Sequence, residues 1–272
     1  LGIGTAGLIG AEMVGRLIGV SQAWRAARVT LRQHLRPFHF KRLAKVLVEY
    51  RVYPLVSLPS MGMNTVAVYV QVPLLAACYG AGSAGAFTLV QRLLTMPLAL
   101  VGQSVADVFH SRLAIECRDD PAGMVPLLWK TVLHLALVCV PGGLLLLFAG
   151  EWLFTLVFGE AWREAGRMAA CMAPAAVSQL VVSPVSRAVV VVNGQRHKLI
   201  YDSMALASAF LILFWAKGLD FTPVRTVGAL SATITAAYLL YLLLLHWLVT
   251  RHAGSLTAHR ISEPSEEEDN RG

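Results

Sequence analysis

Charged side chains inside long apolar stretches are the residues of this sequence that could do chemistry. Two of them, Glu12 and Arg92, lie well inside such stretches. The others lie within a turn or two of the end of an apolar stretch, where a side chain can extend to the lipid headgroups. We interpret five residues in this way: Arg16, Asp107, Lys130, Arg187 and Asp202.

Arg92 points to binding of an anion. An arginine near the middle of a membrane costs at least about 2.5–3.5 kcal/mol on insertion scales, so it should face a polar cavity or a partner. We interpret Arg92 as an anion-binding group in a translocation path, with a structural ion pair as the alternative. Glu12 and Arg16 are four residues apart and share one helix face, where they either neutralise each other or take part in ion coupling.

Motifs of enzymes are absent from the sequence. It has no Gly-rich phosphate loop, no H-E-x-x-H motif and no nucleophile elbow of the G-x-S-x-G type. The four cysteines are scattered without metal-ligand spacing, so neither a zinc site nor a disulfide framework is indicated. We therefore expect no catalytic residues, no metal and no cofactor. The net charge of +7 comes with no nucleic-acid-binding motif or aromatic platform, so we expect no nucleic-acid partner.

Composition places the chain among membrane proteins. Of its 272 residues, 56% are hydrophobic and only 14% are charged, and the mean hydropathy is +0.61. Globular domains have about 45–50% apolar and about 25% charged residues. A membrane-spanning helix needs about 20 apolar residues. By that measure we predict an all-α, polytopic membrane bundle with about seven spans: Leu1–Val20, Val52–Tyr79, Ala84–Ala106, Thr131–Ala149, Met168–Val192, Ile200–Ala216 and Val227–Val249.

Two breaks in these spans have sequence signals. The run from Gly80 to Ser83 predicts a tight turn, so the spans on either side should form a helical hairpin that lines a cavity. Its first arm carries three prolines, which membrane helices tolerate where neighbours satisfy the freed backbone groups. The run Ser183–Arg187 contains Pro184 and should break the fifth span, either as part of a substrate site, as in transporters with broken helices, or as a simple kink.

Basic residues indicate how the spans are oriented. Eight lysines and arginines lie between the first two spans, and the connections expected on the opposite side carry few. By the positive-inside rule the C-terminus is cytoplasmic. Within the basic connection, Phe38–Val48 has the spacing of an amphipathic helix on the membrane surface. The acidic segment from Thr250 to Gly272 is too polar to fold alone, so we expect a disordered cytoplasmic tail.

A series of short motifs resembles one transporter family. In chain order they are P-L-V-S-L-P-S-x-x-x-N (Pro54–Asn64), V-P-L-L (Val72–Leu75), Y-G-A-x-x-x-G (Tyr79–Gly85), Q-R-L-L-x-x-P-L-A-L-V-G-Q-S-V (Gln91–Val105), F-G-E-x-W-x-E-A-G (Phe158–Gly166) and S-P-V-S-R (Ser183–Arg187). Together they resemble the C-terminal half of bacterial polysaccharide transporters of the Wzx-like, lipopolysaccharide- or O-antigen-exporting type. That group belongs to the multidrug/oligosaccharidyl-lipid/polysaccharide exporter superfamily.

The resemblance implies a flippase of the bacterial inner membrane for surface polysaccharide biosynthesis. Its substrate would be an oligosaccharide linked to undecaprenyl diphosphate, and its further partners would be membrane lipids and, in an assembly complex, polysaccharide polymerase and chain-length proteins. On this basis the predicted substrate-binding residues are Arg92, Arg187, Arg16, Asn64 and Gln91. The predicted coupling residues are Glu12 and Asp107.

The resemblance also implies a division of the chain. Residues 1–20 would be the last helix of a first bundle, residues 21–51 a basic cytoplasmic loop, residues 52–249 a six-helix second bundle and residues 250–272 the acidic tail. The chain begins at Leu1 without a basic leader, so we interpret it as part of a longer or truncated gene product. Two alternatives remain open: a cation-coupled multidrug antiporter of the same superfamily, and a non-transporting half-protein scaffold of a polysaccharide assembly complex.

Overall fold

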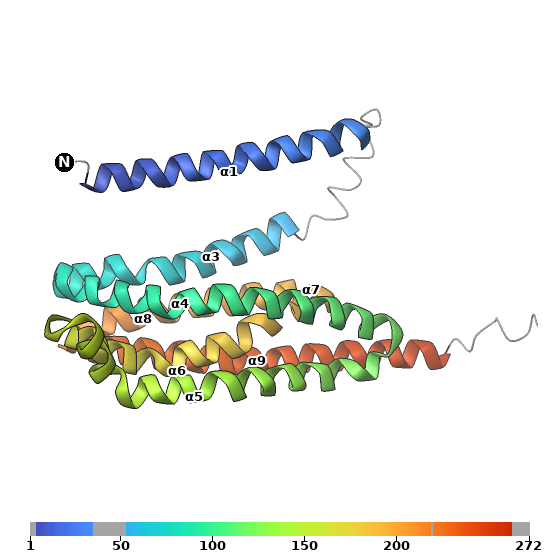
Figure 1. Cartoon of the computed structure of the whole chain (residues 1–272). Coiled ribbons are helices and arrows are strands. Elements are labelled where there is room, and N and C mark those ends of the chain that lie inside the picture. Colours follow the sequence, from blue (N-terminus) through green and yellow to red (C-terminus); the bar gives the residue numbers. More distant parts are fainter. Residues whose placement is uncertain (1–3, 35–52, 219, 263–272) are drawn as a thin grey trace, which may run out of the picture. The chain divides into compact units, whose positions relative to one another are not determined.

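The computed structural model describes residues 4–34, 53–218 and 220–262, and its regular structure in these ranges is entirely helical (Figure 1). This confirms the predicted all-α class. The chain forms two compact units, residues 1–51 and residues 52–272. The first unit contains helix α1 (Gly4–His34). Since α1 continues to His34, the first part of the expected basic loop is helical, and its Ala, Arg and Leu residues are strong helix formers. The predicted surface helix Phe38–Val48 lies outside the described residues.

The second unit is a bundle of long helices. It begins with a π-helical turn (Tyr53–Ser57), and its helices are α3 (Leu58–Tyr69), α4 (Gln71–Asp119), α5 (Met124–Phe158), α6 (Arg163–Val185), α7 (Ala188–Val191), α8 (Gln195–Gly218) and α9 (Pro223–Ser262). Helix covers most of the described part of every predicted span. Within the described residues, four stretches are long and apolar enough to cross a membrane: Leu55–Met96, Pro121–Phe158, Glu160–Val191 and Pro223–Ala258. The chain is therefore a polytopic membrane protein.

The predicted hairpin is present, with its turn at Gly80. This residue has φ of 86° and ψ of 173°, a backbone conformation that residues with a Cβ atom rarely adopt. Here the chain reverses, so the second part of α4 returns alongside α3 (Figure 1). The three prolines of the first arm lie at or near helix starts, where a missing backbone N–H costs little. They are Pro54 in the π-helical turn, Pro59 at the start of α3 and Pro73 near the start of α4.

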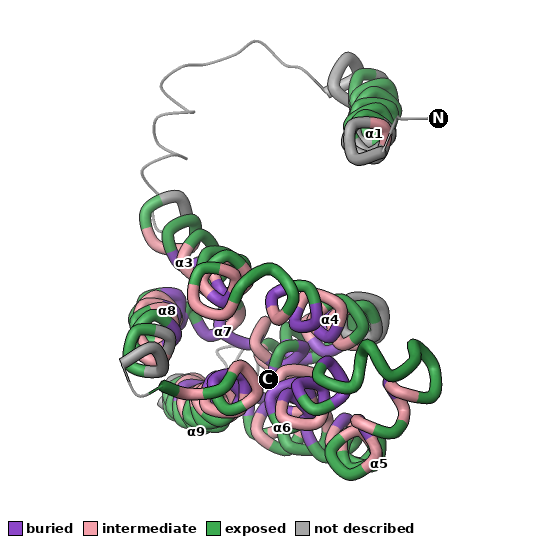
Figure 2. The backbone as a smooth tube through the Cα atoms, turned by 90° about the vertical axis from the view of Figure 1, so that its left-hand side faces the viewer, coloured by how far each residue is buried: buried purple, intermediate pink, exposed green. Residues whose placement is uncertain are grey.

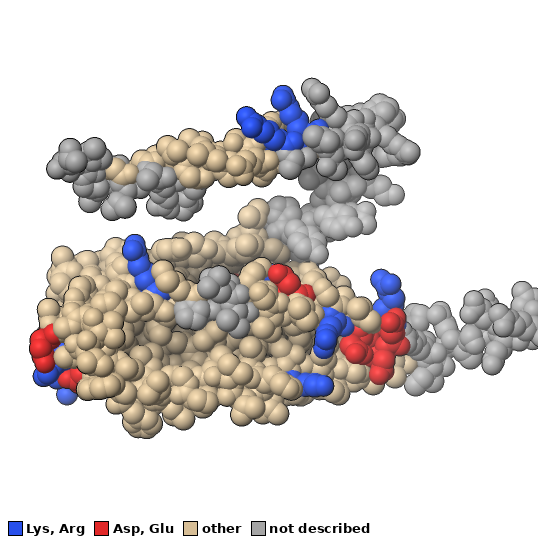
Figure 3. Space-filling model, in the orientation of Figure 1, with Lys and Arg blue, Asp and Glu red and all other residues tan. Residues whose placement is uncertain are grey.

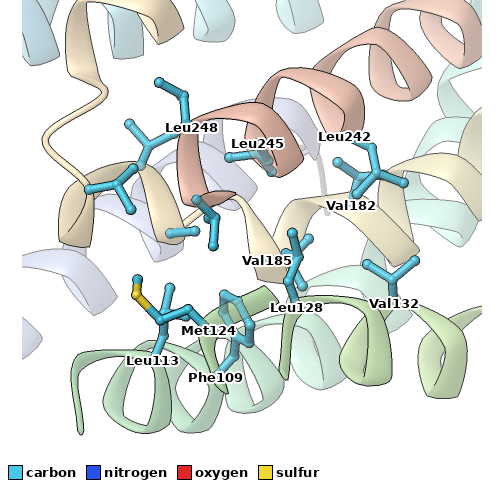
Figure 4. Close-up of a cluster of buried hydrophobic side chains, with 14 of the residues drawn as sticks. Phe109, Leu113, Met124, Leu128, Val132, Val182, Val185, Leu242, Leu245 and Leu248 are labelled. Atoms are coloured by element: carbon cyan, nitrogen blue, oxygen red, sulfur yellow. The ribbon is translucent and has the colours of Figure 1, made fainter. Parts of the chain in front are cut away.

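Helix α6 lies at the centre of the bundle. In an apolar 18-residue segment of the stretch Glu160–Val191, 56% of the residues are buried, a larger share than in the matching segments of the other three described stretches. Figure 2 shows the buried positions gathered on the inward faces of α4, α6 and α9. Two apolar clusters pack along α6. One joins its first half to the hairpin, through residues such as Phe87 and Met168. The other joins its second half to α4, α5 and α9 around Val185 and Leu245 (Figure 4).

Small residues allow α5 and α6 to approach closely. A Cβ added to Gly166 on α6 would lie 2.8 Å from the carbonyl oxygen of Gly150 on α5 and 2.7 Å from the Cα atom of Glu151. Small residues such as glycine let helix backbones approach closely in membranes, where van der Waals packing rather than the hydrophobic effect drives association. The first turns of α6 are thereby held against the last turns of α5.

Charges are concentrated toward the ends of the bundle. On the face shown in Figure 3, most of the acidic and basic side chains lie near the two ends, with a largely uncharged stretch between them. Helix α9 continues through Thr250 to Ser262, so the first part of the expected disordered tail is instead helical. The acidic residues 263–272 lie outside the described residues.

Candidate functional site

A polar cavity lies inside the second unit, among five helices. Its volume is about 260 Å³, and residues of α3, α4, α6, α8 and α9 line it. Six of the lining residues are amides or charged groups: Asn64, Gln71, Gln91, Gln179, Lys198 and Asp202. Interiors of membrane helix bundles are mostly apolar, and polar groups there are expensive to maintain. The cavity is therefore the leading candidate for a functional site in the described part of the chain.

Lys198 and Asp202 form an ion pair in the wall of this cavity. The Lys198 Nζ atom donates to Asp202 Oδ2 at 2.5 Å, one helical turn away on α8. The Ser60 hydroxyl, on α3, also donates to Asp202, and Lys198 Nζ lies 3.4 Å from that hydroxyl. The Asp202 side chain is only 2% exposed, whereas that of Lys198 is 29% exposed. Asp202 is thus held as a partnered carboxylate, and Lys198 keeps one side toward the cavity.

This arrangement corrects the prediction for Asp202. We expected its side chain to extend to the headgroups, because it is near the end of an apolar stretch. The side chain instead points into the bundle, where α3 covers it. An isolated carboxylate could not stay charged in such a place. The lysine one turn before it and the serine of α3 supply the partners that make its burial possible.

Three tyrosines also line the cavity. The rings of Tyr201 on α8 and Tyr241 on α9 stack with their centroids 4.4 Å apart, and Tyr238 lies one turn before Tyr241. The Tyr241 hydroxyl is buried and has no hydrogen-bond partner among the described residues. A buried hydroxyl without a partner is unfavourable, because its lost hydrogen bond to water is not replaced.

The predicted helix break contributes to the cavity as well. Helix α6 ends at Val185 and α7 begins at Ala188, which confirms a break in the run Ser183–Arg187. The Ser186 hydroxyl donates to the Ser183 carbonyl at 2.6 Å. Both serines line the cavity. The break therefore brings hydroxyl groups and backbone of the α6–α7 turn to the polar space.

The hairpin supplies two of the predicted site residues. Asn64 on α3 and Gln91 on α4 both line the cavity. The Gln91 side chain donates to the carbonyl of Val68 across the hairpin at 3.4 Å, so it also joins the two arms. Their predicted role in substrate binding stays a prediction, but the structure brings both side chains to the polar space.

Other predicted site residues lie elsewhere. Arg92 is exposed on α4, outside the cavity lining, and no described acidic residue pairs with it. Arg187 forms an ion pair with Asp107 between the α6–α7 turn and α4. The side chains of Glu12 and Arg16 lie outside the described residues.

The residues that sequence reasoning missed are Gln71, Gln179, Lys198, Asp202 and the three tyrosines. Two signals were available: a lysine and an aspartate four residues apart on α8, and tyrosines three residues apart on α9. Neither signal indicates which helix face is buried. That information comes from α3, whose Ser60 is 142 positions away from Asp202.

Fold and cavity together define a polytopic helical membrane protein with a polar interior site. A model of the family described as "Polysaccharide biosynthesis protein" matches residues 1–167. The chain belongs to this family, and the predicted connection with polysaccharide biosynthesis is confirmed. The match includes the hairpin with Asn64 and Gln91, whereas Lys198, Asp202 and the tyrosines follow it in the chain. A search of curated proteins and a search of solved structures each found no match.

Proposed function

We propose that this protein exports a lipid-linked oligosaccharide, a precursor of surface polysaccharide, across the bacterial inner membrane by alternating access. The observation that carries the proposal is a polar cavity with a lysine in its wall, inside an apolar bundle of a polysaccharide biosynthesis protein. A polar head can cross a membrane only where protein groups replace its water. The cavity supplies amides, hydroxyls and one cation for this purpose, which are the groups that an oligosaccharide with a phosphate would contact.

Each part of the substrate has matching groups in the cavity. Lys198 would bind an anionic phosphate as a point charge. Asn64, Gln71 and Gln91 carry donors and acceptors for sugar hydroxyls, and the stacked rings of Tyr201 and Tyr241 offer an apolar face beside a polar hydroxyl. The phosphate would compete with Asp202 for Lys198. Binding of the substrate would therefore leave Ser60 as the described polar partner of Asp202, which changes the polar contacts between α8 and α3.

The test compares two lysines in cells. The protein would be produced in a strain that lacks its polysaccharide exporter, with surface polysaccharide and membrane levels of the protein measured together. We expect Lys198→Ala and Lys198→Gln to abolish surface polysaccharide relative to the amount of protein in the membrane. Lys130→Ala is the matched control, because Lys130 is exposed on α5 outside this cavity. Unchanged export by the Lys198 variants would contradict the proposal.

Arg92 remains a second candidate for the anion, as a group that contacts the diphosphate or an acidic sugar. Its exposed position on α4, next to the cavity residue Gln91, suits a contact made at the mouth of the path rather than inside it. We expect Arg92→Ala to reduce export less than Lys198→Ala. A larger loss of export in Arg92→Ala than in Lys198→Ala would indicate that the anion binds at the exposed face of the hairpin and not in the interior cavity.

A cation-coupled drug antiporter is the second candidate function. The buried carboxylate of Asp202 favours it, because an acidic group in a cavity can bind a cation. Export of a fluorescent cationic dye from cells separates the two functions. An antiporter would lower dye accumulation and would lose that activity in Asp202→Asn, whereas a polysaccharide exporter would leave dye levels unchanged.

A further inference from the structure

An apolar groove runs along the outer surface between α8 and α9. Its volume is about 370 Å³, and residues on one face of each helix line it. The lining residues on α8 run from His197 to Ser208, and those on α9 from Thr233 to Leu244. Small side chains form the hollow, among them Ala205 and Ala237, and both of these residues line the polar cavity too. The groove therefore adjoins the cavity from the side that faces the membrane.

The dimensions of the groove fit one hydrocarbon chain. From His197 to Ser208, α8 rises about 16 Å, which is about half of the roughly 30 Å hydrocarbon core of a bilayer. The groove is thus long enough for the acyl chain of a lipid in one leaflet.

Cationic and aromatic side chains stand at one end of the groove. His197 lines that end, and its ring meets the ring of Trp247 edge-on, with centroids 5.8 Å apart. The Arg251 guanidinium lies 5.3 Å from the centroid of the same indole. Tryptophan and arginine at the end of a membrane helix are typical of the headgroup level. By the predicted orientation this end faces the cytoplasm, where the leaflet carries anionic lipids.

We propose that the α8–α9 groove binds an anionic membrane phospholipid, with one acyl chain along the groove and its phosphate at Arg251 and His197. The apolar walls provide van der Waals contact for the chain, and the cationic end complements the charge of the headgroup. This site is separate from the proposed transport function, since it lies on the surface of the bundle and takes a resident bilayer lipid.

The test is native mass spectrometry of the purified full chain in detergent. Phosphatidylglycerol and phosphatidylcholine with identical chains would be added in matched series. We expect the anionic lipid to bind at least about fivefold more tightly, since one basic residue near the headgroup contributes roughly 1 kcal/mol. Arg251→Gln should remove that preference and leave phosphatidylcholine binding unchanged. Ala236→Trp, which places an indole in the groove, should weaken both lipids.

Ala207→Trp serves as the matched control, because Ala207 is an exposed alanine of α8 that does not line the groove. Thermal unfolding of each variant in the same detergent would verify that the bundle is intact. Equal binding of the two lipids by the unaltered chain would overturn the proposal. So would lipid binding that Ala236→Trp leaves unchanged, or an effect of Ala236→Trp on self-association alone, which would assign the groove to a second copy of the chain.

Discussion

Two groups of ion pairs in the second unit differ in their surroundings. Lys198 and Asp202 meet in the wall of the polar cavity, where the carboxylate is 2% exposed. Glu151 meets Arg167 at the α5–α6 end of the bundle, at 3.0 Å, with side chains that are 44% and 54% exposed. Both pairs have good geometry. They differ in what surrounds them, and therefore in what their removal should cost.

The two pairs differ in burial. The Asp202 carboxylate lies in the bundle interior, whereas the side chains of Glu151 and Arg167 remain in contact with polar surroundings. Exposed ion pairs contribute little, because water and salt screen them and long side chains lose freedom. Burying an ion pair costs more desolvation energy than the pairing usually returns. The interior pair therefore carries a desolvation cost that the exposed pairs at the α5–α6 end do not. A ligand that binds to its charge would explain why the protein keeps it.

The largest effect is expected for Lys198→Ala. This change leaves Asp202 buried without its cation, a loss of about 3–5 kcal/mol for a buried pair broken on one side. Thermal unfolding in detergent measures it. The double variant Lys198→Ala/Asp202→Ala is the control, since it removes both charges and should recover most of the stability without restoring export. A double variant as unstable as the single one would show that the charges themselves are not the cause.

The next largest effect is expected for Gly166→Ala. If the ion pairs at the α5–α6 end contribute little, close packing must hold these helices together, and a Cβ at position 166 meets Gly150 and Glu151 at under 3 Å. Overpacking of this kind costs about 1–3 kcal/mol. Gly142→Ala on α5 is the matched control, because a Cβ there meets nothing within 4 Å. Equal unfolding temperatures for the two variants would contradict this account of the interface.

A smaller effect is expected for Arg187→Gln. Arg187 pairs with Asp107 at the helix break, with side chains 35% and 59% exposed, so this pair is about as exposed as the pair at the α5–α6 end. Its loss should cost less than about 1 kcal/mol. Export measured beside unfolding separates two roles. Reduced export at an unchanged unfolding temperature would support the predicted part of Arg187 in substrate binding, whereas normal export would leave it a structural pair.

The smallest effect is expected for Arg167→Gln. Its partner Glu151 also lies 3.7 Å from Arg163, so one lost cation leaves the carboxylate another. We expect no measurable change in unfolding temperature at moderate salt, because screening already weakens exposed pairs. A clear loss of stability would remove the contrast between the two groups, since the end of the bundle would then depend on its charges as the interior does.

The sequence by itself determined the membrane class and the positions of the helices. Long apolar stretches have few stable alternatives to helix in a bilayer, because each backbone group must be satisfied within its own segment. The turn at Gly80 and the break after Val185 follow from glycine and proline, whose effects on the backbone are local. Helix ends were less predictable: α9 continues past Thr250 to Ser262.

Only the tertiary structure decided which charges face the interior. Arg92 lies in the middle of an apolar stretch and is exposed, whereas Asp202 lies near the end of one and is buried. Position along a helix says how deep a residue is in the membrane, but burial depends on which helix covers it. Ser60 and Asp202 are 142 positions apart, and no periodicity in either segment specifies their contact. The packing of α3 on α8 buries Asp202 and, with α4, α6 and α9, encloses the cavity.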